Sequence, residues 1–206
     1  MATRPTRTLG VLLAGGRGAR LGGERPKALA DCGGRTLLAR ALATLGSLTD
    51  PVVVVAPAGM PLPVSAAQRV ADMPGAEGPL AGMIAGLGSR RFEEALVLAV
   101  DLPLVGTATL EALRARRGDA LAVLAAPGGI PQPLAAWFGP RAFGALAESL
   151  RAGERSVTRA VLALDPVVLD DAELATLPGG LEAWLNVNTP DELAEAGRRL
   201  AQGSAA

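Results

Sequence analysis

Residues 8–29, TLGVLLAGGRGARLGGERPKAL, join an apolar run to a glycine-rich loop. The apolar run, residues 9–14, is short, rich in leucine and followed by glycine, which predicts a buried strand of a parallel sheet. The loop has little side-chain bulk, so a ligand can approach its backbone, and consecutive N–H groups can bind an anion. Its glycines are Gly15, Gly16 and Gly18. Nearby cationic residues are Arg17, Arg20, Arg25 and Lys27. Together these features predict a triphosphate site.

Two well-known nucleotide-binding motifs do not fit this loop. A P-loop has a lysine that follows glycine and precedes serine or threonine, whereas Lys27 follows Pro26 and precedes Ala28. A dinucleotide fingerprint needs a third glycine, and its register places Leu21 there. The next predicted strand, residues 52–55, also lacks an acidic residue at its end for a ribose. A strand-to-helix loop without a ligand remains the alternative interpretation.

Length and composition indicate one domain. The 206 residues suffice for a single α/β domain over residues 1–206, with short flexible tails at about 1–7 and 202–206. Hydrophobic residues make up 50% of the chain, which supports a sizeable core. The 20 basic and 20 acidic residues balance, so there is no overall basic field for nucleic acid. Aromatic residues are only 2%, which leaves no stacking platform for single strands. We expect no nucleic-acid partner.

Missing residue types exclude several mechanisms. The chain has no histidine and no tyrosine, so a Ser-His-Asp or Cys-His mechanism and a His-ligated zinc site are impossible. Cys32 is the only cysteine, which rules out an internal disulfide and is consistent with a reducing cytosol. No apolar stretch approaches the ~20 residues that span a bilayer. The first residues continue directly into a strand and do not resemble a targeting peptide. We expect a cytoplasmic protein without membrane contact.

Alternating strands and helices predict an α/β fold. Buried strands are predicted at residues 9–14, 52–55, 95–100, 119–125, 134–138 and 181–187. Helices are predicted at residues 36–45, with Gly46 as the C-cap, and at residues 80–87, 107–116, 141–150 and 156–164, with one or two helical turns at 65–70. Thr189, Pro190 and Glu192 have the spacing of a capping box. This order predicts a three-layer, mostly parallel, Rossmann-like sheet with helices on both faces.

Polar residues stand at the ends of two predicted strands. Asp101 follows the strand at 95–100, where parallel sheets bind ligands, and its carboxylate suits Mg²⁺. Capping of the next helix is the alternative role for Asp101, but the predicted triphosphate loop favours the metal. Asn186 and Asn188 end the last predicted strand and offer donors and acceptors for a polar ligand or a metal-bound water.

Two glycines, Gly82 and Gly86, interrupt the predicted helix at residues 80–87. Each costs ~1 kcal/mol relative to alanine in a helix interior. Close approach of a ligand or of another backbone would explain these glycines, and simple close packing of the helix is the alternative.

The opening loop resembles the signature loop of nucleotidyltransferases, through Leu13-Ala14-Gly15-Gly16, Gly18, Arg20-Leu21 and Pro26-Lys27. Later motifs resemble one branch, the molybdenum cofactor guanylyltransferase family. These motifs are Asp72 followed by Gly78-Pro79-Leu80-Ala81-Gly82, Asp101-x-Pro103, Pro131-Gln132-Pro133-Leu134 and Asn186-Val187-Asn188-Thr189-Pro190. The resemblance covers nearly the whole chain. Its Asn-x-Asn-Thr-Pro ending discriminates most, because related cytidylyltransferases tend to have Asp in place of both asparagines.

The resemblance implies a nucleotidyltransferase fold and the transfer of GMP from GTP to the phosphate of molybdopterin, with release of pyrophosphate and with Mg²⁺ as cofactor. The nucleotide-binding residues that it implies are Leu13, Ala14, Gly15, Gly16, Gly18, Lys27, Asp72, Gly78 and Asp101. It implies catalytic roles for Arg20, Lys27 and Asp101, with Asp101 holding Mg²⁺, and it puts Asn186 and Asn188 near the acceptor or the metal. It also implies transient contact with molybdenum-cofactor biosynthesis proteins or apo-molybdoenzymes.

The chain departs from that family at two places. Family members often have Asp before the loop lysine, where this chain has Pro26, as sugar and isoprenoid enzymes do. Many also have Asn just after the second strand, where this chain has Ala56-Pro57-Ala58-Gly59. Transfer from CTP, a sugar-phosphate acceptor and a nucleotide-binding protein without turnover therefore remain alternatives.

A basic turn supplies a hypothesis for the acceptor. Arg155 and Arg159 are four residues apart, so on a helix they would share a face and could bind a phosphorylated acceptor. A solvated helix surface is the alternative interpretation of the same two residues.

Overall fold

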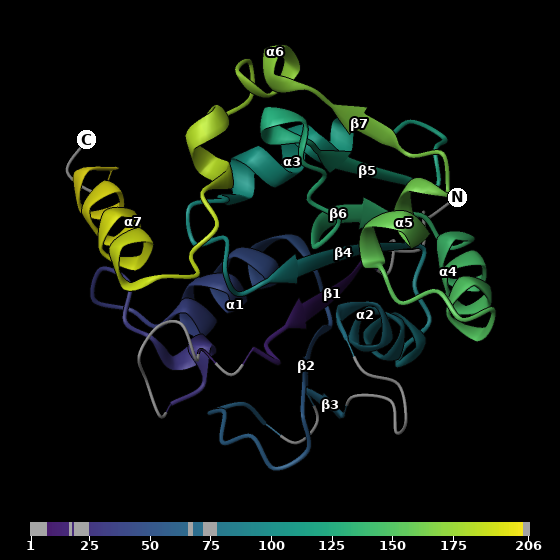
Figure 1. The fold of residues 1–206 in the computed structure, drawn as a ribbon, viewed down its shortest axis with the longest axis horizontal. Helices are drawn as coiled ribbons and strands as arrows, with labels where there is room; N and C mark the ends of the chain where they lie inside the picture. The colour runs from purple at the N-terminus through teal and green to yellow at the C-terminus, as the bar shows by residue number, and fades with distance from the viewer. Residues whose placement is uncertain (1–7, 17, 19–24, 66–67, 72–77, 204–206) are drawn as a thin grey trace, which may run out of the picture.

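A computed structural model of the chain describes residues 8–16, 18, 25–65, 68–71 and 78–203. In these residues a seven-stranded sheet has the order β3-β2-β1-β4-β6-β5-β7 (Figure 1). Its strands are β1 (Thr8–Leu13), β2 (Val52–Ala56), β3 (Arg69–Ala71), β4 (Glu94–Ala99), β5 (Ala122–Ala125), β6 (Ala135–Phe138) and β7 (Val167–Leu169). Strand β6 runs antiparallel to β4 and β5, and the other pairs are parallel. The predicted α/β sheet is confirmed.

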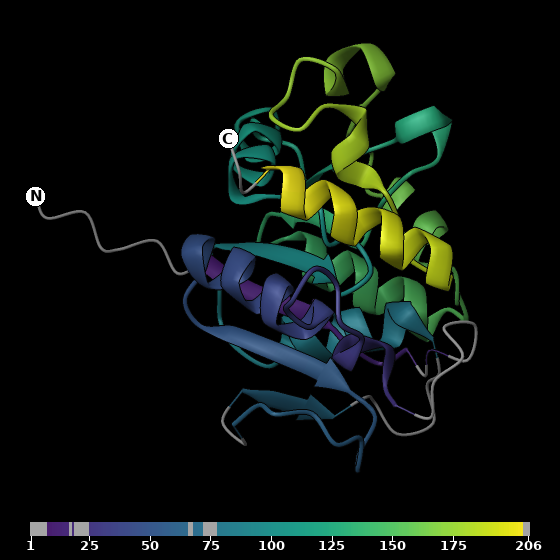
Figure 2. The same ribbon diagram turned by 90° about the vertical axis from the view of Figure 1, so that its left-hand side faces the viewer.

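Helices cover both faces of the sheet, as predicted. They are α1 (Leu37–Leu48), α2 (Pro79–Gly88), α3 (Thr107–Ala115), α4 (Ala142–Arg151), α5 (Val157–Leu162), α6 (Asp171–Leu174) and α7 (Pro190–Gly203), with 3-10 helices η2 (Lys27–Leu29), η3 (Pro127–Gly129) and η4 (Leu181–Trp184). One face carries α1, α3, η4 and α7, and Figure 2 shows α7 lying near α1. The opposite face carries α2, α4 and α5.

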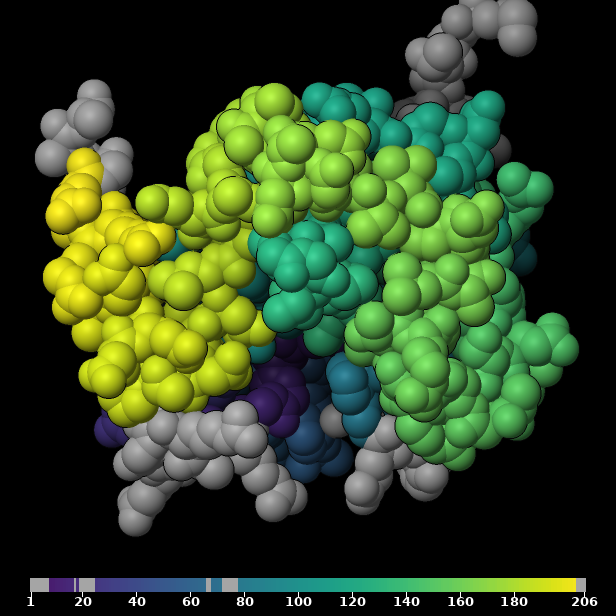
Figure 3. All heavy atoms as spheres, turned by 45° about the horizontal axis from the view of Figure 1, so that its top comes forward, coloured from purple at the N-terminus to yellow at the C-terminus, as the bar shows by residue number. Residues whose placement is uncertain are grey.

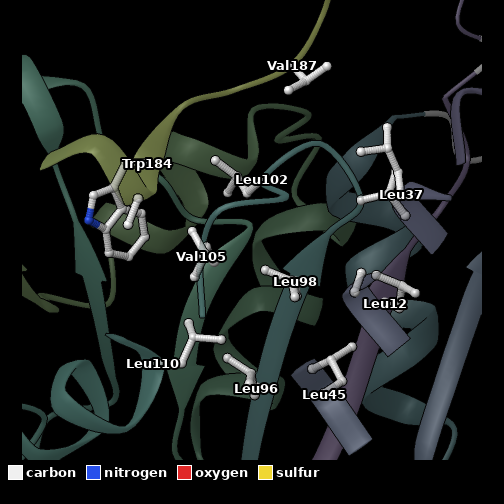
Figure 4. Close-up of a cluster of buried hydrophobic side chains, with 14 of the residues drawn as sticks. Leu12, Leu37, Leu45, Leu96, Leu98, Leu102, Val105, Leu110, Trp184 and Val187 are labelled. Carbon is white, nitrogen blue, oxygen red and sulfur yellow. The ribbon is translucent and has the colours of Figure 1, made fainter. Parts of the chain in front are cut away.

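The core is divided by the sheet into two buried clusters, because successive side chains of a strand point to opposite faces. Along β1, Leu12 belongs to the cluster beneath α1, whereas Leu9 and Val11 pack beneath α2. Figure 4 shows part of the first cluster, where Leu12 and Leu98 from neighbouring strands lie beside helix residues such as Leu45. Burial on both faces explains why the central strands are nearly continuous apolar runs.

Three predicted local features were wrong, and two elements were missed. The segment at 65–70 was expected to be helical, but Arg69–Ala71 is an edge strand parallel to β2. The predicted strand at 181–187 is 3-10 helix η4 and an extended segment, and its buried residues Ala183, Trp184 and Val187 have helical spacing and do not alternate. Gly46 lies inside α1, which ends at Leu48, and does not cap the helix. Strand β7 and helix α6 were not predicted.

The start of α7 was predicted correctly. Thr189 Oγ1 accepts a hydrogen bond from the Glu192 N–H at 3.3 Å, and Glu192 Oε2 accepts one from the Thr189 N–H at 2.9 Å. This reciprocal pair is the capping box that the spacing indicated. None of the helices in the described part of the chain has both the length and the apolar character needed to cross a bilayer.

Candidate active site

A pocket of about 350 Å³ lies at the edge of the sheet beside β1, where the order in which the chain adds strands reverses. From β1 the chain first adds β2 on one side, and later adds β4 on the other, so the carboxyl ends of three parallel strands meet at this edge. Such a switch point is where open α/β sheets bind ligands. The pocket is lined by Leu13, Gly15, Gly16, Lys27, Val55, Gly78, Pro79, Gly82, Ala99, Val100, Asp101 and Leu134. In Figure 3 the purple atoms of the first described segment lie in a hollow beside the yellow C-terminal segment.

The glycine loop connects β1 to the lysine. The Ala14 N–H donates to the Val55 carbonyl at 2.9 Å, which holds the loop against β2, and exposed Gly15 and Gly16 face the pocket. Gly18 has φ +68, and a Cβ there would lie 3.1 Å from the Lys27 backbone nitrogen. Glycine is therefore required at this position by backbone conformation and by space. The loop brings open backbone to the pocket, as predicted.

Helix α2 begins at the pocket wall. Gly78, its N-cap, has φ 100, which favours glycine, and Pro79 occupies the first turn, where a missing N–H costs least. The first N–H groups of a helix have no intrahelical partners, and its dipole favours anions there. This helix start therefore offers a second group of donors for phosphate oxygens.

The two glycines inside α2 have different roles. Gly82 lines the pocket, so a ligand can approach the helix backbone there. Gly86 lies against the sheet, where an added Cβ would clash with Val11 Cγ1 and come within 3.0 Å of Val55 Cγ2. The close-packing interpretation thus applies to Gly86, and for Gly82 the ligand interpretation stays a prediction.

Lys27 is the only lysine of the chain, and it is enclosed at the pocket edge. Its side chain is 10% exposed, and its Nζ donates to Asp101 Oδ2 at 3.1 Å and to Asn188 Oδ1 at 2.9 Å. An ammonium has three donors, and the described residues occupy two of them. Lys27 and Asp101, which the sequence puts 74 residues apart, therefore form one charged pair between η2 and the turn after β4.

The asparagine pair lies in the same network. Asn188 Nδ2 donates to Asn186 Oδ1 at 3.2 Å, which leaves Asn188 Oδ1 directed at Lys27. The Val187 N–H donates to the Asp101 carbonyl at 2.8 Å and fastens the segment to the end of β4. The pair was expected near the acceptor or the metal, which stays a prediction, and its contact with the lysine was not foreseen.

Asp101 does not cap a helix. The N-cap of α3 is Gly106, without a side-chain cap bond, so the alternative role weighed for Asp101 is wrong. The carboxylate is 25% exposed at the pocket, and only Lys27 among the described residues donates to it. A hard oxygen ligand with a free oxygen atom suits Mg²⁺, which usually takes one or two carboxylates together with waters and phosphate oxygens.

The donor set for a metal is incomplete in the described residues. They contain no group of three or more Asp, Glu, His or Cys residues that could hold an ion. Asp101 therefore fits Mg²⁺ only together with substrate oxygens, waters or residues outside the described part. Two of the predicted site residues, Arg20 and Asp72, lie outside the described residues.

Arg155 and Arg159 occupy a different place from the one expected. Helix α5 begins at Val157 with Ser156 as its N-cap, so Arg155 precedes the helix and the expected shared face is wrong. Arg155 Nη1 donates to the carbonyls of Leu150 and Glu154 at 3.1 and 2.9 Å. Neither arginine lines the pocket.

Arg159 is already paired. It donates to both carboxylate oxygens of Glu154 at 2.8 and 2.9 Å. The hydrogen bond from Arg159, followed by those from the Ser156 and Arg155 N–H groups, lowers the pKa of Glu154 to about 2. An acceptor phosphate would have to displace the Glu154 carboxylate from Arg159, or share the guanidinium with it.

Several pocket residues were not singled out from the sequence as site residues. Val55 and Leu134 supply apolar walls from β2 and from the start of β6, and Pro79 completes the wall at α2. Leu134 ends the Pro131-Gln132-Pro133-Leu134 motif, which was the signal for it. Of the predicted nucleotide residues, Ala14 and Gly18 adjoin the pocket without lining it, because Ala14 is buried in the core and Gly18 packs on Lys27.

Comparisons with known proteins agree with this geometry. Residues 10–167 match the family of MobA-like NTP transferase domains. A probable molybdenum cofactor guanylyltransferase from Chloroflexus aggregans is 36% identical over 188 residues, which are 89% of this chain and 90% of that protein. A molybdenum cofactor guanylyltransferase from Pseudomonas putida is 37% identical over 158 residues, 74% of this chain and 81% of that protein.

A solved structure has the same fold. Molybdopterin-guanine dinucleotide biosynthesis protein A from Archaeoglobus fulgidus superimposes with a TM-score of 0.69 at 23% identity, covering 94% of this chain and 99% of that one. The matched region contains the glycine loop, Lys27, the start of α2 and Asp101, which together line the pocket. The chain therefore belongs to the family of MobA-like NTP transferases that includes the molybdenum cofactor guanylyltransferases, and it is a nucleotidyltransferase.

Proposed function

We propose that this protein transfers GMP from GTP to the terminal phosphate of molybdopterin, with Mg²⁺ as cofactor, and releases pyrophosphate. The observation that carries the proposal is the convergence of the glycine loop, the start of α2, Lys27 and Asp101 on one pocket. The names of the relatives from Chloroflexus aggregans and Pseudomonas putida support guanine and molybdenum cofactor as the substrate class.

The proposed reaction needs no strong general base. An oxygen of the acceptor phosphate monoester, already anionic near neutral pH, forms a bond to the α-phosphorus of GTP. The bond from that phosphorus to the bridging oxygen breaks, and pyrophosphate leaves with the electron pair. Such a transfer depends on in-line positioning and on neutralising the charge of the phosphates. A chain without histidine or tyrosine can perform it.

Each group of the site has a role in this proposal. Loop N–H groups and the start of α2 would hold the β- and γ-phosphates, and Lys27 would direct its remaining N–H at the reacting phosphate. Asp101 would be the protein ligand of Mg²⁺, which would supply charge neutralisation for the triphosphate. Arg20 and Asp72 keep the roles expected from the resemblance. We also propose a cytoplasmic location and contacts with proteins of the same biosynthesis or with apo-molybdoenzymes.

Transfer from CTP is the second candidate. Pro26 before Lys27, and Ala56-Pro57-Ala58-Gly59 after β2, differ from the pattern expected of the guanylyltransferase family. A cytidylyltransferase from Thermus thermophilus that acts in methylerythritol phosphate chemistry also shares the fold, with a TM-score of 0.64. This second candidate concerns the nucleobase and the acceptor and leaves the reaction type unchanged.

A pyrophosphate-release screen separates these possibilities. Each of the four NTPs is incubated with the protein and Mg²⁺, with and without molybdopterin. GTP with molybdopterin should give the fastest release, and omission of either should abolish it. Faster release with CTP, or with a sugar phosphate, would replace the proposed substrates. Nucleotide binding without release for any acceptor would indicate a binding protein without turnover.

A further inference from the structure

The extended segment before α7 holds the site lysine from one side. Lys27 Nζ has two partners among the described residues, Asp101 just after β4 and Asn188 on this segment. Asp101 lies two residues beyond the end of β4, and Asn188 lies in a stretch without strand pairing. The position of the ammonium therefore depends also on whatever fixes Asn188.

The Val187 N–H bond to the Asp101 carbonyl fastens the residue before Asn188, and Glu192 fixes Asn188 itself. One oxygen, Glu192 Oε2, accepts the Asn188 N–H at 2.7 Å and the Thr189 N–H at 2.9 Å. A capping box needs only the second of these bonds. The additional, shorter bond to Asn188 reaches one residue further back, to the residue whose side chain holds Lys27.

Charge also connects Glu192 to the lysine. Its hydrogen bond from the Asn188 N–H, followed by bonds from Thr189 and the positive charge of Lys27, lowers the pKa of Glu192. The carboxylate is therefore ionised near neutral pH and stands close enough to Lys27 for the two charges to attract each other.

We propose that Glu192 is a positioning residue for Lys27: it anchors the backbone of Asn188 so that the Asn188 amide holds the ammonium against Asp101. The cap of α7 thus links the C-terminal helix to the phosphate-binding end of β1. Asn188 accordingly acts on the lysine, and not only on the acceptor. The catalytic part of this inference rests on the proposed function. The positioning of Lys27 through Glu192 and Asn188 does not depend on that function.

Chemical labelling tests the contact without any nucleotide. Because Lys27 is the only lysine, acylation of the native protein by an amine reagent modifies one side chain, and mass spectrometry of its peptide gives the rate. We expect Glu192→Ala to raise this rate several-fold, because the ammonium would lose part of what holds it in its enclosed position. Glu192→Gln, which keeps an acceptor oxygen but loses the charge, should give a smaller rise.

Asp191→Asn is the matched control. Asp191 is an exposed carboxylate in the same first turn of α7, and among the described residues it makes no hydrogen bond or ion pair. Asp191→Asn removes one negative charge from the same helix end as Glu192→Gln does, but it breaks no contact with Asn188. The Lys27 labelling rate of Asp191→Asn should therefore equal that of the unaltered protein. Thermal unfolding of all variants measures how much of each effect is ordinary helix capping.

Kinetics complete the test. Glu192→Gln should raise KM for the nucleotide or lower kcat in the unaltered background, yet have no further effect when Lys27→Ala is already present. A labelling rate unchanged in both Glu192 variants, with or without a lower melting temperature, would overturn the inference. Equal kinetic losses in the two backgrounds would overturn it as well. If no nucleotide is turned over at all, the proposed function fails, and the labelling rates still decide the contact.

Discussion

Replacing Gly86 by alanine tests how closely α2 must lie on the sheet. Gly86 is buried, and an added Cβ would clash with Val11 Cγ1 and lie 3.0 Å from Val55 Cγ2. Gly46, inside α1, is exposed and has no atom within 4 Å of an added Cβ. Alanine gains up to about 1 kcal/mol of helix propensity at either position. Only Gly86→Ala also adds the cost of overpacking, about 1–3 kcal/mol.

The difference between the two variants isolates that cost, because the propensity gain cancels. For a chain of this size 1 kcal/mol corresponds to roughly 2–4 °C in Tm, so Gly86→Ala should melt about 2–12 °C below Gly46→Ala. Thermal unfolding followed by circular dichroism measures both. Equal stabilisation by the two substitutions would refute the close packing of α2 on β1 and β2.

The same variant should affect the site. Helix α2 carries Gly78, Pro79 and Gly82 into the pocket wall, so displacing the helix moves the donors at its start. Gly86→Ala should therefore raise KM for the nucleotide several-fold, and Gly46→Ala should leave it unchanged. An unchanged KM in a destabilised Gly86→Ala protein would mean that Val11 and Val55 move to make room for the added Cβ and that α2 keeps its position.

Further predictions concern the charged residues. Asp101→Asn should lower kcat by at least about a hundredfold without loss of fold, because the amide is a poorer Mg²⁺ ligand, and a near-normal rate across a Mg²⁺ titration would remove the metal role. Lys27→Ala should weaken nucleotide binding and slow transfer, and unchanged KM and kcat would show that the enclosed ammonium is unimportant. Arg155→Ala with Arg159→Ala should weaken only acceptor binding, and an equal loss of GTP affinity, or none, would reject that hypothesis. Because Arg159 pairs with Glu154, Glu154→Gln alone should free the guanidinium and leave GTP affinity unchanged, which equilibrium dialysis can measure.

Local sequence signals predicted the parts of the site that lie along one strand and its loop. The apolar run to Leu13, the glycines after it and Asp101 at the end of β4 follow from strand burial and from glycine conformation. The capping box at Thr189 and Glu192 follows from helix chemistry. Each of these signals acts within a few residues of the chain.

Contacts between distant segments could not be predicted in the same way. Lys27 and Asn188 are 161 residues apart, and nothing in local spacing indicates that a capping box also holds a lysine. The antiparallel direction of β6 was missed because a short apolar run has the same pattern in either direction. The four-residue spacing of Arg155 and Arg159 suggested a shared helical face, whereas Ser156 is the N-cap of α5 and Arg155 lies in the turn before it.

The central claim is tested most directly by following the α-phosphate of GTP. The protein is incubated with Mg²⁺, molybdopterin and GTP labelled at the α-phosphorus, and the products are separated and weighed by mass spectrometry. Our account predicts that the label moves into a compound with the combined mass of GMP and molybdopterin, with one pyrophosphate released for each molecule formed, and that Asp101→Asn forms almost none of it. Label that stays in GTP or appears as free GMP, or efficient transfer only from CTP, would contradict the account.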